Sequence, residues 1–181
     1  HSFFTFKILC TMGFPNPFHQ VVPGLFPKGN VQVSYSSNDQ QARSESDLAI
    51  NPTNPRNMVG ASKKFIVPDK YVFTVTTYHT FDGGDTWQEV ELPLQEGWMG
   101  FTDPSLAFNS AGECFIIVEP MFWPDFVNKP EIINSLGMRV FQSNNGGVSW
   151  LPPVTLSTGA GDDKQWMTCD DRSESPFIGN L

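Results

Sequence analysis

The stretch His79–Trp87, with the sequence HTFDGGDTW, decides which fold the chain is expected to adopt. It places hydroxyl, acidic, glycine and tryptophan residues at regular offsets, namely Thr80, Asp82, Gly84, Thr86 and Trp87. The pattern recurs at Ser143–Trp150, SNNGGVSW, where the tryptophan stands 63 positions after the first. A turn motif that returns after a long interval indicates a repeated structural unit.

The residues of this motif suit a hairpin turn. Asp82 can accept hydrogen bonds from backbone N–H groups of its own turn. Gly84 allows the positive φ that a side chain resists, and the hydroxyls of Thr80 and Thr86 can close the loop. Trp87 then opens the next strand and packs its ring against a neighbouring sheet. We therefore predict a structural role for these residues and for their counterparts in the second copy, which are Ser143, Asn145, Gly147, Ser149 and Trp150.

A second series of segments keeps the same period. SDLAINP, PSLAFNS and QWMTCDD begin at Ser46, Pro104 and Gln165, and in each of them apolar and small or polar residues precede an Asn or Asp. Successive copies start 58 and 61 positions apart. Two independent markers with one period of about 60 residues predict a repeat architecture.

Each period can be divided into four short strands bounded by turn residues. Repeated four-stranded units are typical of a β-propeller. We therefore predict an all-β fold, a partial β-propeller with about two complete blades and the start of a third. Residues 1–30 show little periodicity and are expected to form an irregular arm. The propeller region is expected over 31–181, with blades at about 45–93 and 103–157 and a third that begins at about 163.

The composition excludes several classes of partner. The chain has 11 Lys and Arg against 19 Asp and Glu, a net charge of −8 without a basic cluster, so nucleic acid is not expected as a partner. No window approaches the roughly 18 consecutive apolar residues of a membrane span. Cysteine and histidine lack zinc-ligand spacing, so we expect neither a metal site nor a cofactor. Either one disulfide with a free thiol or three thiols fits the cysteines, which are Cys10, Cys114 and Cys169.

The motif Ser/Thr-x-Asp-x-Gly-x-Thr-Trp resembles the Asp-box, the bacterial neuraminidase repeat of sialidase-like propellers. Thr80–Trp87 matches it at every position, whereas Ser143–Trp150 has Asn for Asp and Ser for Thr. The resemblance covers about residues 31–181. It implies a propeller of six blades, a secreted or extracellular protein, and glycans as ligands. Because Asp-boxes also occur in other glycosidases, in sorting receptors and in proteins without a known reaction, the resemblance is specific for the fold rather than for the activity.

The catalytic residues of sialidases have no counterpart in this sequence. It contains no Phe/Tyr-Arg-Ile-Pro motif, and its four arginines stand in other contexts, at Arg43, Arg56, Arg139 and Arg172. A sialic-acid carboxylate requires a bidentate arginine clamp, so no catalytic residue is carried over. Two units and the start of a third would leave unpaired strands. We therefore expect that the chain is a fragment, or that the rest of the propeller or another chain completes the ring.

Two carboxylates are candidates for catalysis. Asp103 stands just before the inner strand of the second unit, and Glu119 ends the strand that follows. Such a pair could serve glycoside hydrolysis with retention at a separation of about 5 Å, or with inversion at about 6.5–9.5 Å. Asp47 and Asp163 recur at similar places in the other units. A turn-capping role in each blade is therefore the competing interpretation.

An insertion in the second unit, PMFWPDFVNKPEIINSLG, breaks the period. Its rings Phe122, Trp123 and Phe126 could form a stacking platform for a sugar. Asp125 and Asn128 could supply polar contacts. The same rings could instead fold down as a plug over the domain or pack on a neighbouring chain.

These observations leave two hypotheses for the function. The first is that the chain is part of a secreted sialidase-like Asp-box propeller that acts on or binds glycans, without a complete catalytic set of its own. It would belong to a glycoside hydrolase if the remaining blades carry the arginine triad and the nucleophile. The second is a non-catalytic propeller module for protein–protein interaction.

Overall fold

The computed structural model describes residues 31–34, 42–67, 71–159 and 161–181. The irregular arm predicted for 1–30 lies outside these residues. The described part of the chain forms nine β-strands and no helix, so the all-β prediction is confirmed. Accordingly, no helix that could cross a membrane occurs among the described residues.

The first sheet is antiparallel, and its four strands follow one another in chain order. This order results from short connections between neighbouring strands. The third strand shows why these segments are extended, since its sequence VFTVTTYHT is rich in β-branched and aromatic residues. All of its residues except Thr74 are buried. The strands are β1 (Arg43–Ile50), β2 (Met58–Val67), β3 (Val72–Thr80) and β4 (Gln88–Glu91).

The second sheet repeats this order, with one addition. Its main path runs β5-β6-β8-β9, and the short β7, which lies in the insertion, pairs with the end of β6. All nine residues of β5 are buried. The strands are β5 (Gly100–Phe108), β6 (Cys114–Phe122), β7 (Asn134–Ser135), β8 (Arg139–Ser143) and β9 (Val154–Thr155). The two sheets span 43–91 and 100–155; that they are blades of a propeller stays a prediction.

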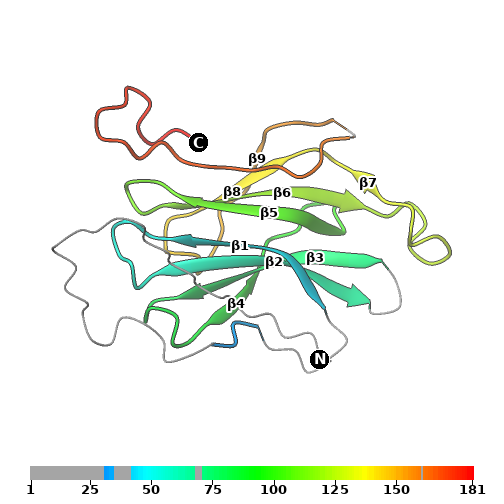
Figure 1. The fold of residues 1–181 in the computed structure, drawn as a ribbon. Coiled ribbons are helices and arrows are strands. Elements are labelled where there is room, and N and C mark those ends of the chain that lie inside the picture. The colour runs from blue at the N-terminus through cyan, green and yellow to red at the C-terminus, as the bar shows by residue number, and fades with distance from the viewer. Residues whose placement is uncertain (1–30, 35–41, 68–70, 160) are drawn as a thin grey trace.

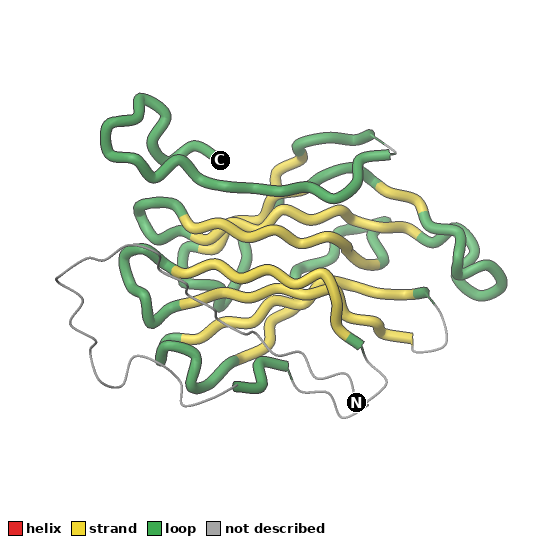
Figure 2. The backbone as a smooth tube through the Cα atoms, in the orientation of Figure 1, coloured by secondary structure: helices red, strands yellow, loops and turns green. Residues whose placement is uncertain are grey.

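The two sheets are stacked face to face (Figures 1 and 2). β5 packs against β1, β2 and β3 of the first sheet. The larger apolar core lies between the sheets and excludes water from both inner faces, which is the main stabilising contribution to the stack. Its fully or almost fully buried members include Val59, Ala61, Val75, Phe101, Leu106, Ile116, Val118, Phe141 and Trp150.

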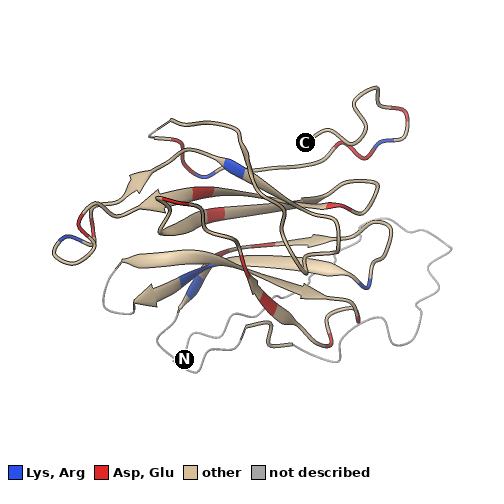
Figure 3. Ribbon diagram, turned by 180° about the vertical axis from the view of Figure 1, so that it is seen from behind, with Lys and Arg blue, Asp and Glu red and all other residues tan. Residues whose placement is uncertain are grey.

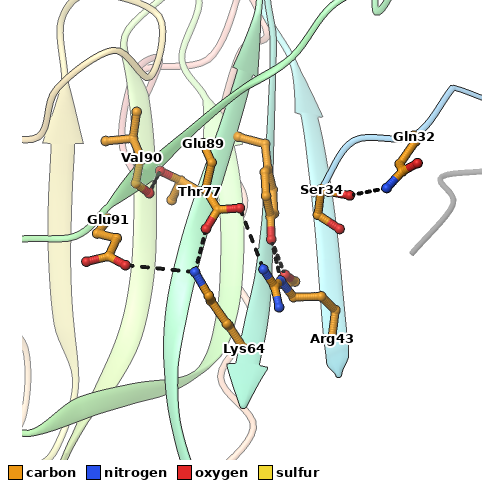
Figure 4. A network of polar contacts seen from close by, with 10 residues as sticks. Gln32, Ser34, Arg43, Lys64, Thr77, Glu89, Val90 and Glu91 are labelled. Carbon is orange, nitrogen blue, oxygen red and sulfur yellow. Dashed lines mark hydrogen bonds and ion pairs between the residues drawn. The ribbon is translucent and has the colours of Figure 1, made fainter. Parts of the chain in front are cut away.

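A polar network ties the strands of the first sheet together (Figure 4). Lys64 on β2 forms ion pairs with Glu89 at 2.7 Å and with Glu91 at 3.9 Å on β4. Arg43 on β1 donates to the Tyr78 hydroxyl at 2.9 Å and lies 3.6 Å from Glu89. The network therefore spans the sheet from its first strand to its last.

The turn between β3 and β4 is held by its own side chains. Asp82 Oδ1 accepts hydrogen bonds from the Thr80 hydroxyl at 2.7 Å and from the Thr86 N–H at 3.0 Å. These bonds lower the pKa of Asp82. The Thr80 hydroxyl accepts from the N–H of Gly84, whose φ of +96° favours glycine. Trp87 donates its indole N–H to the carbonyl oxygen of Gly84 at 3.0 Å.

The turn after β8 has the same bonding pattern. Asn145 Oδ1 accepts from the Ser143 hydroxyl and from the Ser149 N–H, both at 2.9 Å. The amide of Asn145 donates to the Ser149 hydroxyl at 2.8 Å. Trp150 differs from its counterpart in the first turn, because its indole N–H reaches the Thr77 hydroxyl of the other sheet at 3.1 Å.

This second turn docks on the first sheet. Asn57 donates its side-chain N–H to the carbonyl oxygen of Gly146 at 3.0 Å. Gly147 has a φ of +93°, and a Cβ added there would lie 2.6 Å from Val59 Cγ2. A side chain at this position would therefore both strain the backbone and push the two sheets apart.

Residues 161–181 run along the face of the second sheet that is turned away from the first (Figure 1). They form no strand in the described structure. The Met167 N–H nevertheless donates to Ser105 Oγ at 3.2 Å. In the same way, the Leu106 N–H donates to Asp47 Oδ2 at 2.7 Å across the two sheets. Residues 161–181 thus contact the second sheet through the same kind of bond that joins the two sheets.

Candidate carboxylate site

The inner strands of the sheets, β1 and β5, each contain a bulge with an acidic residue in the left-handed region. Glu45 and Asp103 both have a φ of +51°, and the register of each strand shifts at that residue. Pro104 has no N–H for the ladder, which is one reason why the second bulge falls there. Lys164, which stands 61 positions after Asp103, also has a positive φ, of +54°. Because such conformations cost about 1 kcal/mol or more for a residue with a Cβ, their recurrence marks a common structural position.

The bulge of β5 brings the predicted pair Asp103 and Glu119 together. Both residues are buried. Carboxylate oxygens of these two residues and of Asp163 lie within 4.8 Å of one another. The pairing of β5 with β6 places Thr102 opposite Glu119, so the register alone positions the two acids. Figure 3 shows acidic positions on strands of both sheets.

Burial and neighbouring charge weaken the acidity of both members of this pair. Burial, together with the hydrogen bond and the negative charge of Glu45, raises the pKa of Asp103 to about 6. Lys164 opposes this shift from 3.5 Å, but its side chain is 54% exposed and the ion pair is screened. Burial also raises the pKa of Glu119, against a hydrogen bond from Ser135. A carboxyl group with a raised pKa is what a general acid requires near neutral pH.

Glu45 behaves in the opposite way. Its burial by itself raises the pKa, but hydrogen bonds from Asp103 and Lys63 outweigh that effect and lower it. The Lys63 ammonium lies 3.1 Å from Glu45 Oε1, and the Thr102 hydroxyl donates to Oε2 at 3.2 Å. Two hydrogen-bonded carboxyl groups with pKa values pushed apart are a frequent sign of a functional site.

A small cavity adjoins the bulges. Its volume is about 70 Å³, enough for water molecules but below the roughly 300 Å³ of a typical ligand pocket. It lies where the three units meet. Its lining residues are Glu45, Ser46, Asp47, Asp103, Pro104, Lys164, Gln165 and Trp166.

An oxygen-only group of side chains such as Asp103, Glu119 and Asp163 is the kind that hard divalent cations prefer. We nevertheless assign no metal ligands, because the raised pKa of Asp103 and its ion pair with Lys164 favour a proton-carrying acid over a ligand. The expectation that the chain holds no metal and no cofactor stays a prediction.

The insertion places its aromatic rings unequally. Trp123 is only 2% exposed and stacks edge-on against Phe73 with ring centroids 5.3 Å apart. Phe126 packs on the same apolar cluster, whereas Phe122 is 36% exposed. The three rings therefore do not form an open stacking platform. Trp123 and Phe126 pack against the domain, and Phe122 is partly exposed.

The polar residues of the insertion bond to each other. Asp125 Oδ1 accepts hydrogen bonds from the backbone and side-chain N–H groups of Asn128, both at 3.1 Å. These contacts cap a local turn of the kind that Asp commonly forms. Neither bond involves the carboxylate site.

Two residues of the site were missed by the sequence reasoning. Asp47 had been grouped with Asp103, but it accepts backbone N–H groups of Leu48 and Leu106 at 2.8 and 2.7 Å instead. The true counterpart of Asp103 is Glu45, which aligning the repeated segments position by position would have indicated. Lys63 carried no signal in the sequence that distinguishes it from its neighbour Lys64.

Comparison with known proteins gives distant likenesses in structure only. No family model matches the chain, and no curated protein matches it either. A Dyadobacter fermentans protein of unknown function is similar with a TM-score of 0.49 and 17% identity, over 67% of this chain and 38% of that one. The Hadza microbial sialidase Hz136 gives 0.47 and 15%, over 63% and 26%. Trypanosoma rangeli sialidase in complex with sialic acid gives 0.43 and 14%, over 64% and 20%. The chain thus spans between a fifth and two fifths of these structures, and the values assign it to no family.

Proposed function

We propose that the chain forms consecutive blades of a secreted, sialidase-like Asp-box propeller protein that acts on or binds glycans at the carboxylate site. The observation that carries this proposal is the buried pair of Asp103 and Glu119, in which the pKa of Asp103 is raised to about 6. A sugar hydroxyl or glycosidic oxygen is a natural partner for such a carboxyl group, which can donate as well as accept.

The arrangement of the blades supports the proposal. The two sheets have the same strand order and the same type of turn after their third main strand, and each makes the same kind of contact with the segment that follows it. Further blades would continue this stack around a ring. The ring would then be completed by the rest of the propeller or by another chain.

The arginines favour a ligand other than sialic acid at this site. Arg43 contacts Tyr78 and Glu89, and Arg139 donates to the carbonyl oxygens of Met138 and Ser157; none of these partners belongs to the cluster of Asp103, Glu119 and Asp163. The negative charge of the carboxylate cluster would also repel the carboxylate of a sialic acid. Hydrolysis of sialosides would therefore require residues outside this chain.

Fluorogenic glycosides and a panel of neutral and sialylated oligosaccharides test the proposal directly. Hydrolysis or binding of at least one glycan is expected. Asp103→Asn and Glu119→Gln should each lower kcat/KM by about 100-fold or more, or abolish the binding where no turnover occurs. Asp85→Asn, which alters an exposed acid in the turn after β3, is the matched control and should behave as the unaltered chain. Absence of any glycan response, or equal loss in the control, would refute the proposal.

The alternative is a non-catalytic module for protein–protein interaction. It is favoured by large apolar side chains at the surface of the third unit, with Trp166 77% exposed. Phe177, Ile178 and Leu181 are exposed in the same segment. Under this alternative, light scattering should detect concentration-dependent association that Trp166→Ser weakens, while the glycan panel gives no response.

A further inference from the structure

The Glu45 carboxylate is held at both of its oxygens. Oε1 lies 3.1 Å from the Lys63 ammonium, and Oε2 accepts a hydrogen bond from the Thr102 hydroxyl at 3.2 Å. Glu45 and Asp103 line the same small cavity, and the residue next to Asp103, Thr102, is the one that donates to Glu45. Because two ionised carboxylates placed so close repel each other, we expect one of the two acids to keep a proton.

The surroundings of Lys63 decide which acid is ionised. The Lys63 side chain is only 5% exposed. Its ammonium lies over the rings of Phe73 and Tyr71, at 4.1 and 5.1 Å from their centroids, and 3.2 Å from the Tyr71 hydroxyl. A buried ammonium is stable only beside an anion, and Glu45 is the carboxylate that it contacts. Removing the charge from Glu45 would therefore leave Lys63 buried without its counter-ion.

We propose that Lys63 fixes the negative charge on Glu45 and thereby makes Asp103 the member of the pair that carries the proton. Lys63 is then a positioning residue, since it acts on Asp103 through Glu45. The inference deepens the proposed function, because the proton that Asp103 offers to a glycan would be regulated from the buried side of the first sheet. It needs no ligand to be tested.

The charged groups around the pair come from every neighbouring element. Glu119 on β6 and Asp163 in the third unit add negative charge and keep a proton on the cluster. Lys164 partly offsets this charge at Asp103. Lys164 is the cation among these three, and its ion pair is with Asp103 rather than with Glu45. Lys63 is therefore the cation that helps to lower the pKa of Glu45, while burial raises that of Asp103. Among the described residues, the titratable groups next to the pair are Lys63, Glu119, Asp163 and Lys164, together with Asp47 in the wall of the shared cavity.

The experiment is an NMR titration of the carboxyl carbons of Asp103 and Glu45 in the ¹³C-labelled 181-residue chain, between pH 3 and 9. In the unaltered chain the step near pH 6 should appear at Asp103 Cγ, while Glu45 Cδ titrates below its ordinary range. In Lys63→Met the midpoint of Glu45 should rise by about one pH unit or more, because its cation is lost. The matched control is Lys64→Met, which removes the adjacent lysine that pairs with Glu89, and it should leave both midpoints unchanged.

Two results would overturn the inference. One is a step near pH 6 at Glu45 rather than at Asp103, and the other is an unchanged Glu45 midpoint in folded Lys63→Met. If the amide spectrum of Lys63→Met shows an unfolded chain, the double variant Glu45→Gln with Lys63→Met decides instead, because it leaves neither member of the buried ion pair alone. It removes the negative charge beside Asp103, so the midpoint of Asp103 must fall, and an unchanged midpoint contradicts the inference. Since no glycan is present, these outcomes are independent of the glycan panel.

Discussion

The two turn tryptophans, Trp150 and Trp87, should differ sharply in their contribution to stability. They hold equivalent positions in the repeat, but Trp150 is buried and bonds to Thr77 of the other sheet. Trp87 is half-buried and bonds to Gly84 within its own turn. The same substitution, Trp to Phe, therefore removes an inter-sheet contact in one case and a local one in the other.

The magnitude follows from the groups that are lost. Trp150→Phe removes one buried hydrogen bond, about 1 kcal/mol, and leaves a gap in the core where the second ring of the indole had packed, about 1–2 kcal/mol more. The expected loss in the free energy of unfolding is about 2–3 kcal/mol. Trp87→Phe loses a half-exposed bond and little packing, so about 0.5–1 kcal/mol is expected.

Urea unfolding followed by circular dichroism measures both variants under identical conditions. For a chain of this size, the loss of about 2–3 kcal/mol in Trp150→Phe should also lower Tm by roughly 4–12 °C. Equal losses in the two variants would refute the assignment of Trp150 to the contact between the sheets.

Three further outcomes are expected from stability measurements. Gly100→Ala should cost about 3 kcal/mol or prevent folding, because the added Cβ would lie 2.1 Å from the carbonyl oxygen of Phe73; a wild-type Tm would contradict this. Asn145→Asp should change the free energy of unfolding by less than about 0.5 kcal/mol, because Ser149 can donate to a carboxylate. Asn145→Ala should lower it by about 1 kcal/mol, because the bonds within the turn are lost. Equal effects of the two substitutions would show that the side chain does not hold the turn. The folded-state pKa of Asp103, about 6, exceeds its unfolded value of about 3.9, so the folded chain binds more protons between pH 4 and 6 and the free energy of unfolding should fall by about 2–3 kcal/mol as the pH rises through this range. Asp103→Asn should flatten that fall, and an unchanged slope would show that Asp103 is not its source.

The sequence was sufficient for features that depend on local contacts. The turns at Thr80–Trp87 and Ser143–Trp150 bond within eight residues, so the pattern of residue types predicted their positions. The sequence did not indicate that the ladder of β5 resumes beyond the bulge at Pro104 and reaches back to Gly100, because a proline usually interrupts strand pairing.

The site was predicted only in part because its contacts join distant segments. Asp103 and Glu119 lie on neighbouring strands, so their proximity followed from the expected hairpin. Glu45 meets Thr102 only through the stacking of the two sheets, which no pattern in one strand reveals. The burial of Trp123 likewise depends on Phe73 of the other sheet, and the sequence could not decide whether the ring was open or packed.

The recurring left-handed bulge has a consequence for how the protein could change over evolutionary time. Three successive units hold this backbone conformation with three different side chains, Glu45, Asp103 and Lys164. The conformation therefore tolerates an acid of either length or a base, and each of these side chains makes a polar contact with an adjacent unit. Substitution at these positions would alter the charge of the site one unit at a time while the strands and the core stay intact. Side chains at these positions can therefore be exchanged, and the chemistry of the site can change, while the backbone fold is retained.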